Sequence, residues 1–319
     1  MNTGVSWSSL LPSLPRGRRL DRREIATSGP DQRIPLELGK AKPTPNRMPY
    51  SIARIRRLHG GSQAQMLLCS DGFYYAVKFQ NNPQGRRSLA SEMLGTLLAM
   101  ELGLSTQQPA VIHVDDNFVH SASDMCVERP TGTIRYQPGL CYGSRYPHEV
   151  APQRKGRLAI IRDELPSGPM SWLLNGADFA GMLVFDQWTC NTDDRQVIFW
   201  RTMNCMWFRA SMIDQGHCFA GARWRFPDST MWGRYRKSKV HAGFKTFDAF
   251  EPWLQRLECK VGEATLREAA RAIPSEWYDD DVEALDRLLE ELDARRKRVR
   301  ELVWSAARCS PDWFSQFGH

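Results

Sequence analysis

Three polar signatures, far apart along the chain, constrain this sequence most. The first is a glycine turn, His59-Gly60-Gly61-Ser62, followed by an apolar stretch that ends near Lys78. The second is the polar run at 186–193, and the third is Ile213-Asp214-Gln215-Gly216. An unobstructed turn, a strand lysine and later acidic segments, in this order, are the parts that a phosphate-binding site needs. The fold must therefore bring three distant segments together.

Length and composition predict a folded protein without membrane contact. The 319 residues, 42% of them hydrophobic, can form one large or two modest cores. No stretch approaches the roughly 20 consecutive apolar residues that cross a bilayer, and no apolar signal-peptide core is visible. Eight cysteines are scattered without a Cys-x-x-Cys pair, which favours reduced thiols over a zinc site or disulfides. We therefore expect a cytoplasmic protein.

The net charge of +7 is concentrated at the start of the chain. Residues 1–49 hold nine Lys and Arg against four acids, which leaves only +2 for the rest. The same residues hold seven of the nineteen prolines and few large apolar side chains, so they predict a disordered basic tail. Because the body of the chain is nearly neutral, a nucleic-acid-binding face is not indicated, and contact with nucleic acid is expected only indirectly, if at all.

Short runs rich in β-branched and aromatic residues begin at residue 51. They predict four strands, three before a helix and one after it, at 52–58, 63–69, 73–80 and 111–114. Asp71-Gly72 is expected to form the hairpin turn between the second and third strands. Apolar residues spaced by three and four predict the helix at 89–102, which Gly103 should end.

The later sequence predicts mainly helices. Residues 115–155 are rich in Gly, Pro, Tyr and Ser and indicate a link with short strands. Amphipathic segments predict helices at 179–188, 247–259, 263–272 and 281–308. The basic run at 295–298 is interpreted as a solvated helix face. The fold class is α+β, with a β-rich part at 50–150 and a larger, mainly helical part at 151–319.

Lys78 and the glycine turn are candidates for binding a nucleotide. A lysine that ends an apolar strand must direct its ammonium to a polar partner, and Glu92 is the only acid in the first half of the following helix. In a phosphoryl-transfer site such a pair neutralises nucleotide phosphates. The turn Gly60-Gly61-Ser62 would bring backbone N–H groups close to phosphate, because glycine removes the side-chain obstruction.

The two later signatures offer metal ligands and a general base. Asp214 follows an apolar strand and precedes a turn, where a carboxylate suits Mg²⁺. Asp186 and Asn191 show the spacing of a catalytic base followed by a metal-binding Asn, but Asp186 falls near the end of a predicted helix. Asp193 is the alternative base and the one we prefer, although Ile198 then occupies the position of the metal-binding Asn. Asp186 and Asp193 are therefore both candidates for the general base.

Together these motifs resemble the HipA-like kinases. The resemblance rests on the glycine turn with Tyr75-Ala76-Val77-Lys78-Phe79, on the segments 185–193 and 213–216, and on Ala272-Ile273-Pro274-Ser275-Glu276-Trp277-Tyr278. It covers roughly residues 50–305. It implies a protein-kinase-like, two-lobed fold with a small β-rich N-lobe and a larger, mainly helical C-lobe.

The resemblance also implies an activity and partners. It implies binding of ATP and Mg²⁺, a Lys78–Glu92 pair, Asp193 as the catalytic residue of an Asn-Thr-Asp motif, and Asp214 as a metal ligand. HipA proteins are serine/threonine kinases of toxin–antitoxin systems, so a protein substrate and an antitoxin-like partner are implied. Ile198 departs from the family pattern. It favours a rival hypothesis, a pseudokinase that binds a nucleotide or a protein without turnover.

Overall fold

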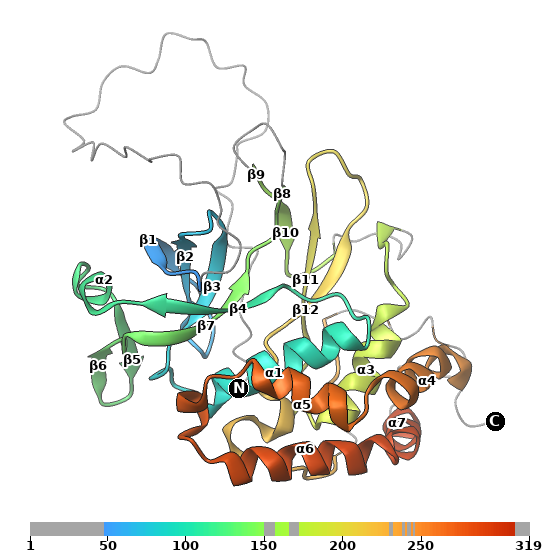
Figure 1. Cartoon of the computed structure of the whole chain (residues 1–319). Coiled ribbons are helices and arrows are strands. Elements are labelled where there is room, and N and C mark those ends of the chain that lie inside the picture. The colour runs from blue at the N-terminus through green and yellow to red at the C-terminus, as the bar shows by residue number, and fades with distance from the viewer. Residues whose placement is uncertain are drawn as a thin grey trace, which may run out of the picture.

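The computed structural model describes residues 48–149, 157–165, 172–229, 232–237, 240, 244 and 246–309. It shows a mixed α/β structure, with a five-stranded and a three-stranded antiparallel sheet and several helices (Figure 1). The basic tail predicted for 1–49 lies, up to residue 47, outside the described residues. The boundary expected between residues 150 and 151 also lies outside them. None of the described helices is long and apolar enough to span a bilayer.

The larger sheet confirms the strands predicted before residue 115. Its order is β1 (Ser51–Arg57), β2 (Gln65–Cys69), β3 (Tyr74–Lys78), β7 (Gly139–Arg145) and β4 (Pro109–Val114), and each neighbouring pair is antiparallel. Side chains alternate between its faces, as the two-residue period of a strand requires. Leu67 and Val77 pack into one apolar cluster, while Met66 and Ala76 pack into another. Both faces of the sheet are therefore covered.

The interior strand β7 lies in the segment predicted only as a link with short strands, because its composition resembles that of a loop. Gly143 lies in the middle of β7 and pairs with Val77 on one side and Ala110 on the other. A Cβ atom at this position would lie 2.5 Å from Ile112 Cγ1 and 3.2 Å from Tyr75 Cδ1. Large neighbouring side chains thus occupy the space above a small strand residue, which a local sequence pattern does not reveal.

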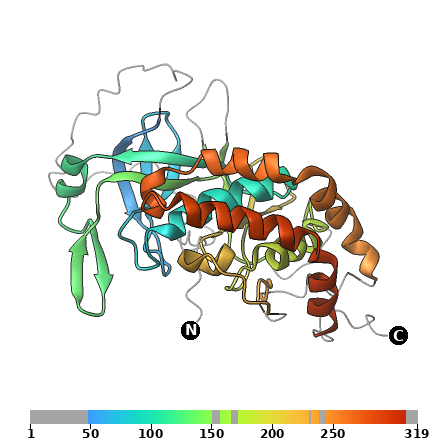
Figure 2. The same cartoon turned by 60° about the horizontal axis from the view of Figure 1, so that its bottom comes forward.

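The helix α1 (Arg87–Glu101) confirms the prediction for 89–102. Gly103 follows it in the left-handed region, with φ 84°, and the Gly103 and Leu104 amides bond back to the carbonyls of Met100 and Ala99. This glycine-ended termination satisfies the last carbonyls of the helix. In Figure 2, α5 (Glu263–Arg271) and α6 (Val282–Arg296) run in front of α1, which packs against α5 and also against β4 and β7.

The second half of the chain contains a sheet as well as the predicted helices. Strands β10 (Ile160–Arg162), β11 (Gln196–Arg201) and β12 (Arg209–Ile213) pair in that order. Helices α3 (Asp178–Thr189) and α4 (Glu251–Lys260) confirm two predicted segments. The smaller elements are α2 (Asp116–His120), β5 (Cys126–Arg129), β6 (Gly132–Arg135), β8 (His148–Glu149), β9 (Arg157–Leu158), and the 3₁₀ turns η3 (Cys218–Arg223), η5 (Phe247–Ala249) and η6 (Ser275–Tyr278).

The single helix predicted for 281–308 is wrong, because the chain breaks after α6 and resumes as α7 (Val299–Arg308). Arg295 is the physical reason that the basic run was misread. Its side chain is buried, and its guanidinium donates to the carbonyls of Trp188 and Gln187 at 2.9 and 2.8 Å. Arg295 thus binds the last turn of α3, whereas Lys297 and Arg298 remain exposed, as predicted.

The contact between α3 and α4 gives a test of core packing. Gly181 on α3 faces the Trp253 ring, and a Cβ atom there would lie 2.4 Å from Trp253 Cδ2. We expect Gly181→Ala to lower the free energy of unfolding by about 1–3 kcal/mol, measured by urea denaturation. Gly262→Ser is the control, because no atom lies within 4 Å of that Cβ and serine suits the N-cap of α5. Equal stability of Gly181→Ala and wild type would contradict this packing.

Candidate active site

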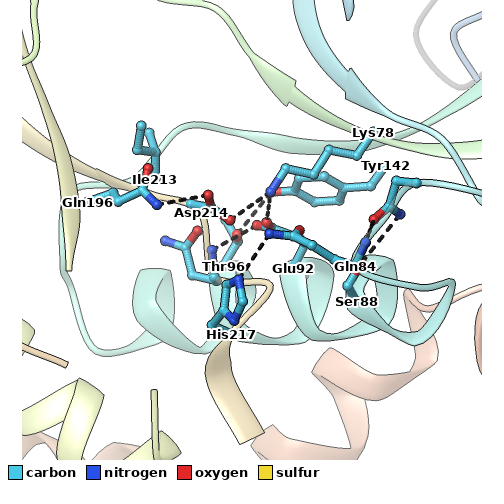
Figure 3. Close-up of polar contacts among 12 residues, drawn as sticks. Lys78, Gln84, Ser88, Glu92, Thr96, Tyr142, Gln196, Ile213, Asp214 and His217 are labelled. Atoms are coloured by element: carbon cyan, nitrogen blue, oxygen red, sulfur yellow. Dashed lines mark hydrogen bonds and ion pairs between the residues drawn. The ribbon is translucent and has the colours of Figure 1, made fainter. Parts of the chain in front are cut away.

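Lys78 joins three distant segments of the chain at one point (Figure 3). Its ammonium donates to Oε1 of Glu92 and to Oδ1 of Asp214, the second contact at 2.7 Å. Lys78 is the last residue of β3, Glu92 lies in the second turn of α1, and Asp214 directly follows β12. All three side chains are buried, at 8%, 1% and 5% exposure. The structure therefore brings together Lys78, its expected partner Glu92, and Asp214, which the sequence singled out separately.

Each carboxylate also has a second partner. Glu92 Oε2 accepts a hydrogen bond from the backbone amide of Gln215 at 2.9 Å, and Asp214 Oδ2 accepts one from Gln196 Nε2 at 3.1 Å. Asp214 adopts a left-handed backbone with φ 60°. This conformation is uncommon for a residue other than glycine, and such strain often marks functional sites. The contacts around the carboxylate hold it in place.

The pKa values follow from burial and from the shared ammonium. Burial raises the pKa of Glu92 to about 7, because the loss of water outweighs the attraction of Lys78. Burial also acts to raise the pKa of Asp214, but Lys78 and the hydrogen bonds hold it well below its usual range. The pKa of Lys78 is raised, since the two carboxylates outweigh its desolvation. Asp214 is thus the more strongly ionised carboxylate of the two.

The glycine turn lies at the same end of the larger sheet as Lys78. β2 starts at Gln65, which pairs with Val77, so the turn between β1 and β2 adjoins the end of β3. Gly60 has φ 134°, and its carbonyl accepts a hydrogen bond from Gln63 N at 3.0 Å. Gly60 and Gly61 form the turn, and residues other than glycine rarely adopt the φ of Gly60.

Buried polar atoms without partners test whether these residues fit a phosphate ligand. The hydroxyl of Ser62 is buried in the glycine turn and has no hydrogen-bond partner in the part of the chain that the structure describes. The same holds for Gln215 Nε2, beside Asp214, and for Gln84 Oε1, whose Nε2 lies 3.0 Å from His217. Such buried groups call for a further partner. Ser62 belongs to the glycine turn and Gln215 follows Asp214 in the chain, so the chemistry of these atoms is compatible with a polar ligand there.

The segment 186–193 holds two candidate carboxylates in different settings: Asp186 is bound by other side chains, whereas Asp193 lies in a loop. Asp186 is buried near the end of α3, where Arg195 donates to both of its oxygens, Nε to Oδ2 at 2.9 Å. Asn191 donates to Asp186 Oδ1 at 3.1 Å, and its own oxygen accepts from the Asp193 amide at 3.2 Å. Burial raises the pKa of Asp186, and Arg195 and Asn191 oppose this shift. Asp186 and Asn191 also line a cavity of about 390 Å³ on the helical side.

Asp193 lies in the loop after α3 and is only half-buried. Its Oδ1 accepts from the Asp194 amide at 2.8 Å, and its carbonyl accepts from the Gly233 amide at 3.1 Å. The preceding residue, Thr192, donates its amide to the His217 carbonyl at 3.1 Å. The loop that carries Asp193 is therefore bonded directly to the segment that follows Asp214.

Sequence reasoning missed Gln196, which contacts Asp214. Ile198, the position expected to hold a metal-binding Asn, is fully buried in the apolar cluster that includes Ala76 and Ile213. Gln196 lies two residues earlier on the same face of β11 and pairs with Ile213 across the sheet. The available signal was the register of two segments, 196–201 and 209–213, which places the glutamine amide opposite the residue before Asp214.

The sequence has no match among family models, and no curated protein matches it. Several solved structures are similar in fold at low identity. They include the Helicobacter pylori proinflammatory kinase CtkA, at 14% identity and a TM-score of 0.46, over 77% of this chain and 95% of that one. The Golgi casein kinase follows at 11% and 0.41, over 82% and 73%. HipA of Shewanella oneidensis, in complex with HipB and operator DNA, gives 11% and 0.40, over 85% and 69%.

The Asp186–Arg195 pair yields a stability prediction. Removal of one partner leaves the other charge buried, so we expect Arg195→Met to lower the free energy of unfolding by about 3–5 kcal/mol. Arg271→Met is the matched control, because its ion pair with Glu268 is exposed and should contribute little. The free energy of unfolding of each variant is measured by denaturant titration and compared with that of wild type. Similar small losses in both would contradict a structural role for the buried pair.

The raised pKa of Glu92 predicts a pH dependence. The folded chain holds this proton up to a pH of about 7, whereas an unperturbed glutamate loses it near 4.5. Since the folded state binds more protons in this window, the free energy of unfolding falls as pH rises through it. We expect wild type to lose stability relative to Glu92→Gln between pH 5 and pH 8, in urea titrations at each pH. A difference that is constant, or that moves in favour of wild type, would contradict the shift.

Proposed function

We propose that this protein is an ATP- and Mg²⁺-dependent kinase with a protein-kinase-like, two-lobed fold. The observation that carries the proposal is the contact of Lys78 with both Glu92 and Asp214. A strand lysine, a helix glutamate and a later aspartate meet at one buried point, although 136 residues separate Lys78 from Asp214. Phosphoryl transfer needs these groups together, because it depends on positioning and on neutralising phosphate charge.

Within this proposal each residue has a distinct role. Lys78, positioned by Glu92, neutralises the nucleotide phosphates, and the glycine turn at 60–62 supplies backbone N–H groups and the Ser62 hydroxyl. Asp214 holds the metal ion, which would neutralise charge on the transferred phosphoryl group. A phosphate group that reaches Lys78 competes with Asp214 for the ammonium, since those two groups now touch at 2.7 Å. Binding therefore exchanges one ionic partner for another.

Asp193 is the proposed general base that accepts the proton of the substrate hydroxyl. Its half-buried loop position leaves it accessible, whereas both oxygens of Asp186 are engaged by Arg195. A base must be within hydrogen-bond reach of the proton that it accepts. Asp186 remains the second candidate, with Asn191 as the metal ligand of that reading, and the variants below distinguish them.

Gln196 is the proposed second side chain at the metal. Its amide already contacts Asp214 Oδ2 at 3.1 Å, and a side-chain carbonyl oxygen suits a hard divalent ion. Rotation of the amide would present that oxygen beside the Asp214 carboxylate. Gln196 would then replace the amide that Ile198 lacks, which keeps an active kinase compatible with this sequence.

The finer assignment is a HipA-like kinase that phosphorylates a serine or threonine of another protein in the cytoplasm. The motif resemblance at 185–193 and 213–216 supports it, and with it an antitoxin-like partner. The alternative is a pseudokinase that binds a nucleotide or a protein without turnover. The buried Ile198 favours that alternative, because it places no metal-binding amide at the expected position.

Phosphoryl transfer and nucleotide binding are tested together on one set of variants. Purified protein is incubated with MgATP, phosphosites are identified by mass spectrometry, and binding is followed by thermal shift. We expect Lys78→Ala and Asp214→Asn to lose the MgATP-dependent shift. Asp193→Asn should keep the shift and lose at least about 100-fold in transfer rate, as expected for removal of a general base.

Gln196 and Asp186 provide the controls. Gln196→Ala should weaken binding of Mn²⁺ in the presence of ADP, measured by electron paramagnetic resonance, whereas Gln255→Ala, which alters an exposed glutamine on α4, should not. Asp186→Asn should lower stability more than it lowers transfer per folded molecule. Binding of MgATP without any transfer in wild type would establish the pseudokinase, and the absence of MgATP binding would refute both proposals.

A further inference from the structure

A second, basic cavity lies where three elements meet. It has a volume of about 500 Å³ and is formed by the start of α1, the segment 223–226 that begins at the last residue of η3, and α6. The ion pair of Arg87 with Asp281 links the start of α1 to the start of α6 at this cavity. Four arginines line the cavity, together with the carboxylates Asp281 and Glu291; the arginines are Arg87, Arg223, Arg225 and Arg287.

The four guanidinium groups differ in their contacts. Arg87 Nη2 forms an ion pair with Asp281 Oδ2 at 2.7 Å, and Asp281 also caps α6 by accepting from the Ala284 amide. Arg223, Arg225 and Arg287 are exposed. None of these three forms an ion pair or a side-chain hydrogen bond with any residue in the described ranges. Three of the four arginines are thus available to an external anion.

An aromatic wall borders these charges. The guanidinium carbon of Arg87 lies 5.1 Å from the centre of the Trp224 ring, and the Trp224 indole donates to the Ser91 hydroxyl at 3.1 Å. Phe226 also lines the cavity. An arginine stacked on an aromatic ring keeps its planar fork fixed for binding carboxylate or phosphate oxygens. The wall also offers contact to the organic part of a ligand.

The segment that carries two of the arginines has an unusual backbone. Phe219, Ala220 and Trp224 all adopt left-handed conformations, with φ 60°, 53° and 49°. Ser91 on α1 bonds this stretch twice, because its hydroxyl donates to the Gly221 carbonyl at 3.2 Å and accepts from the Trp224 indole at 3.1 Å. Non-glycine residues hold such conformations only where surrounding contacts impose them. Strain of this kind is common in ligand clamps and switch segments.

We propose that this cavity binds a phosphate monoester. Four guanidinium groups against two carboxylates leave a charge of +2, which matches the charge of roughly −1.5 to −2 on a phosphate monoester at pH 7. The three oxygens of a phosphate group can accept hydrogen bonds from several guanidinium groups, whereas a single carboxylate binds one guanidinium in a bidentate pair. A bound phosphate would link Arg87 on α1 to Arg223 and Arg225, and so tighten the contact between the helix and the strained segment.

This inference goes beyond the proposed kinase activity and does not depend on it. Lys78 and Asp214 do not line the basic cavity, so their loss should leave it intact. The cavity nevertheless adjoins the two elements that carry the site, because α1 holds Glu92 and the strained segment continues from Asp214. A ligand there would act on the site through its supporting elements.

The test uses the full chain and probes that carry one phosphate. A fluorescein-labelled peptide with one phosphoserine is titrated with protein in EDTA, and anisotropy is compared with that of the unphosphorylated peptide. AMP and inorganic phosphate serve as competitors. Because hydrogen bonds between charged groups are lost, we expect Arg223→Ala/Arg225→Ala to weaken phosphopeptide binding at least about tenfold. Bound phosphopeptide should also slow hydrogen exchange of the amides at 218–226.

The matched control removes the same charge elsewhere. Arg162→Ala/Arg308→Ala replaces two exposed arginines that lie outside the cavity and should change the affinity less than about twofold. Stronger binding of the phosphopeptide than of AMP would assign a phosphorylated polypeptide as the source, and the reverse would assign a nucleotide. Equal binding of phosphorylated and unphosphorylated peptides, or an equal loss in the control variant, would overturn the proposal. Repetition with Lys78→Ala separates this site from the proposed nucleotide site.

Discussion

The ammonium of Lys78 is the interaction on which the arrangement of the site depends. Two buried carboxylates, on α1 and after β12, would repel each other without a cation between them. The lysine supplies it from the end of β3, so the larger sheet, the long helix and the smaller sheet meet at one atom. Its contact with both acids keeps Asp214 ionised, whereas burial raises the pKa of Glu92 in spite of that contact, so two neighbouring carboxylates have different proton affinities.

A second buried ion pair, between Arg195 and Asp186, helps to hold Asp214 in its contact with Lys78. Arg195 binds the Asp186 carboxylate and also donates to the carbonyl of Ile213, the residue before Asp214, at 3.1 Å. It therefore fixes the end of β12 to the end of α3. The amide of Thr192 bonds the His217 carbonyl, so the loop carrying Asp193 follows the same support. Arg195 thus holds in place the segment that carries the proposed metal ligand Asp214.

Local patterns sufficed for the first four strands, for α1 and for the pairing of Lys78 with Glu92, because each is set by neighbouring residues or by a single strand–helix step. They failed where distant contacts decide. β7 depends on Ile112 and Tyr75 filling the space above Gly143, and the end of α6 depends on Arg295 reaching α3. The contact of Gln196 with Asp214 required the register of β11 and β12, which no single segment contains.

The bracing by Arg195 has a mechanical consequence. Asp214 is attached to α3 and the smaller sheet, whereas Lys78 is attached to the larger sheet to which β3 belongs. Any shear between these two frameworks appears directly as a change in the separation of Nζ and Oδ1. The ion pairs of Lys78 with Glu92 and Asp214 therefore link the larger sheet to α1 and to the smaller sheet, and they resist displacement of one relative to the other.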